Sequence, residues 1–178
     1  MLEHWGAIVE WTAIGSVATL AAVCDVRTGR VPNVLTFGAA AAGFAFSTLH
    51  AGLSGLGTSL LGCLVGFVLF LPLFALGGMG GGDVKLLAAI GAWIGPMGAL
   101  QAALWASLVG GVLAVIVGIS SGYLREAIRN LFAMVAVWRA VGPSPISDLT
   151  LAQSRGPRLA YAVPIGIGAI IAMWLGRQ

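Results

Sequence analysis

Apolar residues occur along the chain in six blocks, separated by short segments that are polar or rich in glycine and proline. A helix that spans a membrane needs about 20 predominantly apolar residues, and most of the blocks approach that length. The pattern therefore predicts an all-α integral membrane protein with six transmembrane helices. We expect these helices at residues 5–24, 34–49, 56–76, 84–94, 97–119 and 159–175.

A further segment, at about residues 122–141, has a different pattern. Its apolar residues recur at spacings of four and three, and arginines lie beside them. This spacing is typical of an amphipathic helix on the inner membrane surface, where membrane lipid would be its partner. The apolar positions are Leu124, Ile128, Leu131, Val135 and Trp138.

Composition agrees with a membrane location. The 178 residues are 59% hydrophobic and only 8% charged, with a mean hydropathy of +1.01. These values lie outside the range of ordinary soluble domains, and the length allows one membrane-embedded domain over residues 1–178. Nucleic acid is not an expected partner.

Basic residues are distributed unevenly between the two sides of the predicted bundle. With six spans, eight of the nine lysines and arginines lie on one side, and only Arg177 lies on the other. The positive-inside rule assigns the eight to the cytoplasm, so both termini are expected outside.

A carboxylate follows directly on the glycine-rich segment Gly77 to Gly82, at the start of the fourth apolar block. From Asp83 to the Gly95–Pro96 break there are about 12 residues, or ~18 Å of helix, against a hydrocarbon core of ~30 Å. Asp83 is therefore expected below the inner surface, with the glycines lining a cavity open to the cytoplasm. Alternatively, Asp83 could simply cap the helix.

A second carboxylate, Asp25, lies at the inner end of the first helix. It could pair with Arg27 or Arg30 nearby. However, Asp25 and Asp83 are the only acids left once those near the outer end and in the large cytoplasmic loop are set aside. Two carboxyl groups in one desolvated pocket cannot both ionise easily, so one keeps a proton while the other acts as a base that activates water. Neither a metal nor a cofactor is expected.

Both carboxylates lie in segments that resemble a known family. The stretch from Asp25 to Thr36, and the GxGD motif at Gly80 to Asp83 followed by Val84-Lys85-Leu86, resemble the two signatures of type IV prepilin peptidases. The resemblance implies that Asp25 and Asp83 are a catalytic pair. It also implies that the substrate is a prepilin or pseudopilin precursor, whose short basic leader is removed at the cytoplasmic face of the bacterial inner membrane.

Other residues of these segments are expected to support the pair. The glycines before Asp83 would let a substrate backbone approach closely. Lys85 either snorkels to the interface or tunes the charge of Asp83, and Asn33 is expected to cap the second helix. The positions of Arg27 and Arg30 are explained about as well by the positive-inside rule as by a role in the site. The supporting residues are Gly80, Gly81, Gly82, Lys85, Arg27, Arg30, Pro32 and Asn33.

The chain differs from the larger members of the family it resembles, which carry an insert with two CxxC pairs between the first two helices. Here that loop has about nine residues, so N-methyltransferase activity is not expected. The size is typical of the short, peptidase-only form of tight-adherence (Flp-type) pilus systems. The stretch from Tyr161 to Pro164 also resembles the family, more loosely, and is expected to have at most a supporting role.

Two other classes of function fit part of the pattern. A small transporter or channel subunit could also contain a glycine-broken helix with buried acids, but no second interrupted helix mirrors the first. A non-catalytic scaffold of a secretion system would leave the two aspartates without a role.

Overall fold

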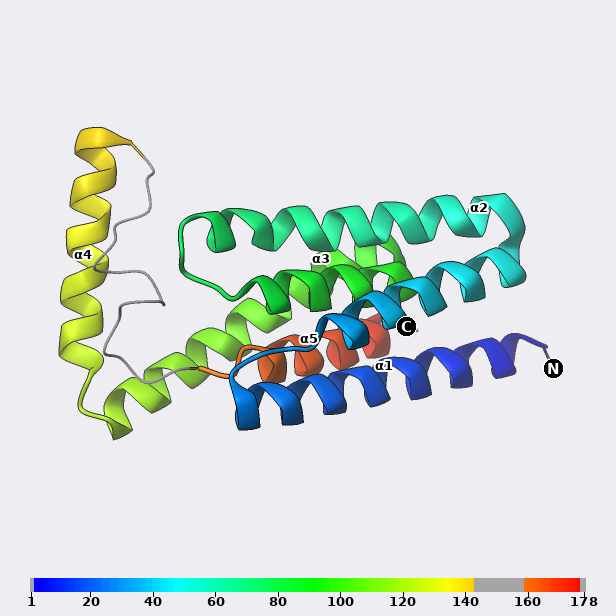
Figure 1. The fold of residues 1–178 in the computed structure, drawn as a ribbon, viewed down its shortest axis with the longest axis horizontal. Helices are drawn as coiled ribbons and strands as arrows, with labels where there is room; N and C mark the ends of the chain where they lie inside the picture. Colours follow the sequence, from blue (N-terminus) through cyan, green and yellow to red (C-terminus); the bar gives the residue numbers. More distant parts are fainter. Residues whose placement is uncertain (1, 143–158, 177–178) are drawn as a thin grey trace.

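The computed structural model describes residues 2–142 and 159–176, and the regular elements among them are all α-helices (Figure 1). The predicted all-α class is confirmed. Three helices are long and apolar enough to cross a membrane, and α5 is shorter. The helices are α1 (Leu2–Thr28), α2 (Asn33–Ala75), α3 (Gly81–Ser120), α4 (Leu124–Val141) and α5 (Ala162–Leu175).

Two of the long helices contain a break in their backbone. Ala51 and Gly52 depart from helical angles within α2, and Gly95 does so within α3. Gly52 and Gly95 have φ of 63° and 71°, a region that glycine enters without steric cost. Figure 1 shows α2 reversing direction at the end of the bundle away from α4. The break predicted at Gly95 is confirmed, whereas the number of six membrane spans stays a prediction.

Helix boundaries differ from the predicted ones where the aspartates lie. The first helix continues beyond residue 24 to Thr28, so Asp25 lies near its end rather than after it. Likewise, α3 begins at Gly81 rather than Val84, so Asp83 lies in its first turn. The end turns of a helix need no apolar face, so helices can extend into polar and glycine-rich residues. Hydropathy alone therefore cannot locate these two helix ends. The last helix begins at Ala162, after the expected residue 159.

The helices pack closely at positions occupied by glycine. A Cβ atom at Gly62 of α2 would lie 2.1 Å from the Gly91 carbonyl oxygen of α3. On the other side of α3, a Cβ atom at Gly168 of α5 would lie 2.5 Å from the Ala102 carbonyl oxygen. Small residues let backbones meet in this way in membrane proteins. The core therefore centres on α3, between α2 and α5.

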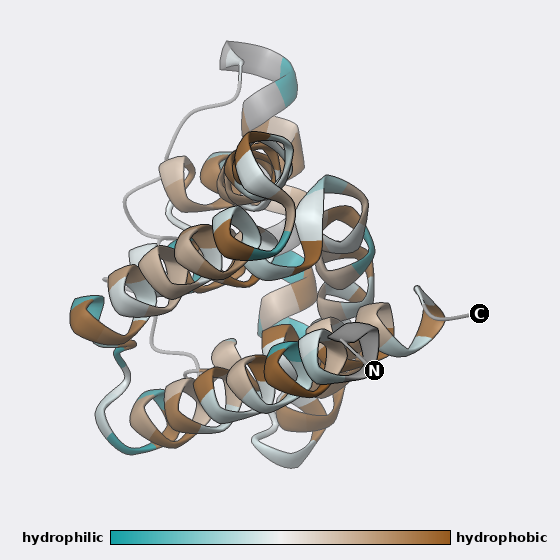
Figure 2. Cartoon of the chain, turned by 90° about the vertical axis from the view of Figure 1, so that its right-hand side faces the viewer, coloured by the Kyte–Doolittle hydropathy of each residue, from teal (hydrophilic) through white to brown (hydrophobic). Residues whose placement is uncertain are grey.

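The outside of the bundle is apolar as well. Figure 2 shows brown and pale residues over most of the helix surfaces, with teal limited to short stretches. Val34, Leu49 and Leu53 are among the most exposed side chains. A surface of this kind suits a protein whose surroundings are lipid.

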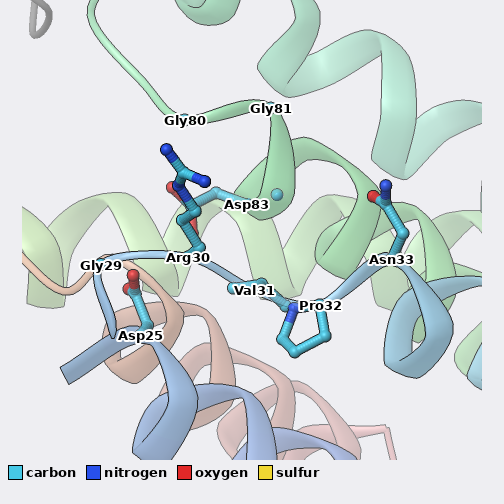
Figure 3. A pocket seen from close by; sticks show the side chains of 10 residues that line it. Asp25, Gly29, Arg30, Val31, Pro32, Asn33, Gly80, Gly81 and Asp83 are labelled. Carbon is cyan, nitrogen blue, oxygen red and sulfur yellow. The ribbon is translucent and has the colours of Figure 1, made fainter. Parts of the chain in front are cut away.

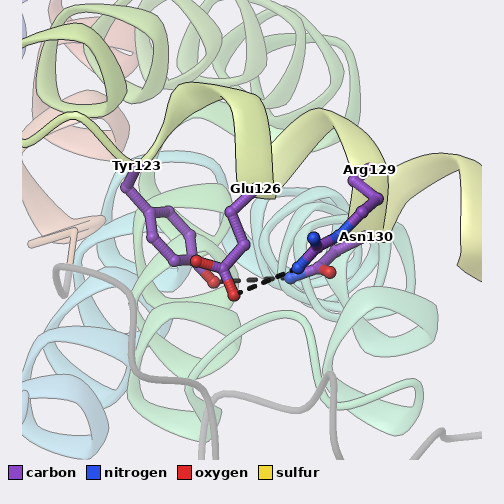
Figure 4. A network of polar contacts seen from close by, with 4 residues as sticks. All are labelled: Tyr123, Glu126, Arg129 and Asn130. Atoms are coloured by element: carbon purple, nitrogen blue, oxygen red, sulfur yellow. Dashed lines mark hydrogen bonds and ion pairs between the residues drawn. The ribbon is translucent and has the colours of Figure 1, made fainter.

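Helix α4 stands apart from the bundle and runs at a large angle to it (Figure 1). Its Phe132 side chain is 71% exposed. On its polar side, Arg129 lies 3.5 Å from Glu126, and the Asn130 amide donates a hydrogen bond to the Tyr123 hydroxyl at 3.4 Å (Figure 4). The predicted helix is confirmed, and its location on a membrane surface stays a prediction. Arg155 and Arg158, two of the eight basic residues assigned to the cytoplasm, lie outside the described residues.

Candidate active site

Two connecting segments meet at one end of the bundle and enclose a cavity of about 400 Å³ (Figure 3). One segment joins α1 to α2, and the other joins α2 to α3. Both predicted catalytic residues and most of the predicted supporting residues line the cavity. The lining residues are Asp25, Gly29, Arg30, Val31, Pro32, Asn33, Gly80, Gly81, Gly82 and Asp83.

The glycines of the GxGD motif allow the two segments to touch. A Cβ atom at Gly82 would lie 3.1 Å from the Val31 Cβ and 3.3 Å from the Val31 backbone nitrogen. A Cβ atom at Gly80 would lie 3.1 Å from Oδ2 of Asp83. These glycines were expected to make room for a substrate backbone. In the structure they make room for the protein's own groups, which brings the two motifs together.

Asp83 is the more deeply buried carboxyl group of the cavity, with 8% of its surface exposed. Its backbone N–H donates to the Gly80 carbonyl oxygen at 3.1 Å, which closes the first turn of α3. The Asp83 carboxyl group also interacts with the Gly80 backbone and, electrostatically, with Asp25. The structure therefore brings the two predicted catalytic residues within interaction range.

Asp25 is partly buried and is held from a distant part of the chain. The backbone N–H of Ala162, the first residue of α5, donates a hydrogen bond to Oδ2 of Asp25 at 3.1 Å. Sequence reasoning missed this contact, because a backbone donor carries no side-chain signature. The only available signal was the loose resemblance of the stretch from Tyr161 to Pro164.

Tyr161 lies beside this contact. Its ring meets Phe70 of α2 edge-on, with the ring centres 6.2 Å apart, and a Cβ atom at Gly110 of α3 would lie 2.8 Å from the Tyr161 hydroxyl. Tyr161 also interacts electrostatically with Asp83. The start of α5 is thus associated with both aspartates.

Two predicted supporting residues do not line the cavity. Arg27 is exposed in the last turn of α1. The Lys85 ammonium donates a hydrogen bond to Oδ1 of Asn33 at 2.9 Å and lies 5.5 Å from the centre of the Phe37 ring. Lys85 therefore joins α3 to the start of α2 beside the cavity.

The predicted cap of α2 is wrong. Asn33 is the first helical residue, whereas Pro32 occupies the capping position with extended angles (φ −63°, ψ 135°) and makes no side-chain capping bond. Proline fixes its own φ near −65°, so the helix starts directly after it. The Asn33 side chain is free to accept the hydrogen bond from Lys85 instead.

The chemistry available in this cavity comes from two interacting carboxyl groups. The titratable side chains that line it are Asp25, Asp83 and Arg30. A carboxyl pair of this kind can hold one proton between its members, so that one acts as a base and the other as an acid. The cavity is large enough for water, and peptide hydrolysis by water is the reaction that such a pair supports.

Comparison with known proteins gives two matches. Residues 12–115, which contain both aspartates, match the model of the type IV leader peptidase family. A prepilin leader peptidase/N-methyltransferase from Xanthomonas campestris pv. campestris is 52% identical over 62 aligned residues, and the match covers 31% of this chain. The match spans only 22% of that relative's own length. No solved structure matches the chain.

Proposed function

The chain belongs to the type IV leader peptidase family, and we propose that it is an aspartic endopeptidase that removes the short basic leader from Flp-like prepilins. The observation that carries this proposal is the meeting of Asp25 and Asp83 at one cavity, within the region that matches the family. Two acids from separate motifs, in interaction range, supply what metal-free hydrolysis of a peptide bond needs.

The proposed reaction uses one ionised and one protonated carboxyl group. The ionised group takes a proton from water as the water oxygen bonds to the peptide carbonyl carbon. The protonated group gives its proton to the carbonyl oxygen, forming a tetrahedral intermediate. When the C–N bond breaks, the amine takes the first proton and the second returns to its donor. The pair ends with one proton, as it began.

The proposed place of cleavage is the cytoplasmic face of the bacterial inner membrane, with both termini outside. The cavity lies at the end of the bundle where α1 ends and α3 begins. The arm of α3 before its break, from Gly81 to Ile94, is short for a hydrocarbon core of ~30 Å. This length favours a site near the membrane surface rather than at the bilayer centre.

The subtype is proposed from the link between α1 and α2. This link comprises residues 29–32, so no domain is inserted there. A chain with so short a link has no counterpart of the cytoplasmic insert of the larger enzymes. We therefore propose that this protein cleaves the leader and does not N-methylate the product, as in the short form of Flp-type systems.

Co-expression with a candidate prepilin tests the proposal. Asp25→Asn and Asp83→Asn should each reduce cleavage by about 100- to 10,000-fold, the usual contribution of a general acid or base. Cleavage is followed by the shift of the precursor on a gel. Glu126→Gln is the matched control, because Glu126 is an exposed acid of α4 far along the chain from the cavity. Full cleavage by either aspartate variant would rule out the paired mechanism.

A further inference from the structure

The hydrogen bond from Ala162 to Asp25 joins two residues that lie 137 positions apart. Ala162 is fully buried and begins α5. The first N–H groups of a helix have no partner within the helix and must be satisfied elsewhere. The Ala162 N–H is one of these donors, and it binds the side chain of Asp25, a proposed catalytic residue.

The position of this donor is set by contacts with two other helices. Tyr161, the preceding residue, is held between Phe70 of α2 and Gly110 of α3. Further along α5, the backbone of Gly168 lies against the backbone of Ala102 of α3. The Ala162 N–H is therefore fixed by the packing of the bundle and does not depend on Asp25 for its place. A fixed donor orients the carboxylate that it binds.

The electrostatic surroundings of Asp25 give this donor a second effect. Asp25 lies near the C-terminal end of α1, where the helix dipole is negative, but its Oδ2 meets the N-terminal end of α5, where the dipole is positive. A hydrogen bond donated to an ionised carboxylate favours that form. Among the described residues, the other charged or titratable groups that line the cavity or interact with its acids are Arg30 of the link, Asp83 of α3 and Tyr161 before α5. Arg27 is exposed on α1 itself.

We propose that the Ala162 N–H is a positioning group for catalysis, which holds Oδ2 of Asp25 so that Oδ1 is the atom that takes the proton from water. The proposal rests on the peptidase function proposed above. In this step an O–H bond of water breaks, its proton bonds to Oδ1, and the water oxygen bonds to the substrate carbonyl carbon. The carbonyl π electrons move to the carbonyl oxygen, which takes the Asp83 proton. Asp25 is then the base, and the more buried Asp83 is the acid.

An ester at one peptide bond tests this role. Cell-free synthesis into lipid nanodiscs, with lactic acid in place of Ala162, removes the N–H and leaves the side chain intact. We expect kcat on a synthetic prepilin peptide to fall about tenfold, the usual cost of one bond to a charged group, with KM unchanged. The split between kcat and KM distinguishes a misplaced catalytic group from a loss of substrate binding.

The matched control is lactic acid in place of Ala169, another fully buried alanine of α5. It also loses one backbone N–H, but one in the helix interior that has a partner within the helix. This ester therefore costs the helix at least as much, yet it should leave kcat close to that of the unaltered protein. Gly110→Ala provides a second variant, because its Cβ would lie 2.8 Å from the Tyr161 hydroxyl and displace the start of α5. It should also lower kcat and leave KM unchanged.

Three results would contradict either the positioning role of Ala162 or the proposed peptidase function. Equal falls in kcat at residues 162 and 169 would reduce the Ala162 bond to a structural one. An unchanged kcat at residue 162 would overturn the positioning role and leave the paired mechanism intact. Full activity of Asp25→Asn would instead overturn the proposed function itself.

Discussion

The two ends of the bundle are built in different ways. Toward the turns at Gly52 and Gly95, helices are tied by direct contacts: the Trp93 indole N–H donates to the Ala39 carbonyl oxygen at 2.8 Å, and the Ser59 hydroxyl donates to the Ala92 carbonyl oxygen. At the opposite end, the connecting segments surround a cavity with two carboxyl groups. One end of the bundle is thus closed by packing, whereas the other end keeps two interacting acids, of which Asp83 is buried and Asp25 partly buried.

Among changes that leave both aspartates in place, the largest effect is expected at the contact between the two motifs. Gly82→Val should lower cleavage by about 100-fold, because its side chain would push Val31 away and misplace the aspartates relative to each other. Gly78→Val is the control, since the nearest atom to a Cβ there is a carbonyl oxygen at 3.5 Å. Both are assayed by precursor cleavage at equal expression. If the two variants cleave equally well, the Gly82 contact does not position the site.

The pH dependence of cleavage should come from the cavity end alone. In acid both carboxyl groups are protonated and no base remains, whereas in alkali both are ionised and no acid remains. The rate in detergent should therefore fall on both sides of an optimum, by roughly tenfold per pH unit at the extremes. Gly62→Ala, at the packed end, should leave the positions of both limbs unchanged. A flat profile would exclude a pair that shares one proton.

Stability should respond most strongly at the packed end. Gly62→Ala forces α2 away from the Gly91 carbonyl oxygen and should cost about 1–3 kcal/mol of unfolding free energy, as overpacking does. Gly57→Ala is the control on the same helix, with nothing within 4 Å of its Cβ, and should stabilise by about 0.5–1 kcal/mol. Tryptophan fluorescence on heating in detergent measures both. Equal thermal unfolding midpoints for Gly62→Ala and Gly57→Ala would show that the close contact between α2 and α3 is not a main source of stability.

The smallest effect is expected at Lys85. Its bond to Asn33 is exposed, so Lys85→Met should lower kcat/KM by no more than about threefold, since an exposed polar contact contributes little. Lys85→Arg, which keeps the charge, should fall between Lys85→Met and the unaltered protein. A loss above tenfold, or a moved pH limb, would make Lys85 a group that tunes Asp83.

Local patterns predicted much of this arrangement. Hydropathy located the long helices, the Gly95–Pro96 step located the break in α3, and the two motifs located the aspartates. What the sequence could not reveal depends on contacts between distant segments. The Ala162 donor is a backbone group, and Gly82 is recognisable as a contact point only once Val31 is seen against it. The cap of α2 was misplaced because the rigid angles of Pro32 outweigh the capping preference of Asn33.

The hydrogen bond between Asp25 and Ala162 also orders events during synthesis. Helix α1 is synthesised before α5, so Asp25 is present before the backbone donor at Ala162 that holds its carboxylate. Between the addition of Asp83 and that of Ala162, the nascent chain therefore carries both aspartates without the backbone group that holds Asp25. If Ala162 has the proposed positioning role, full proteolytic activity arises only once α5 has docked against α1 and α3.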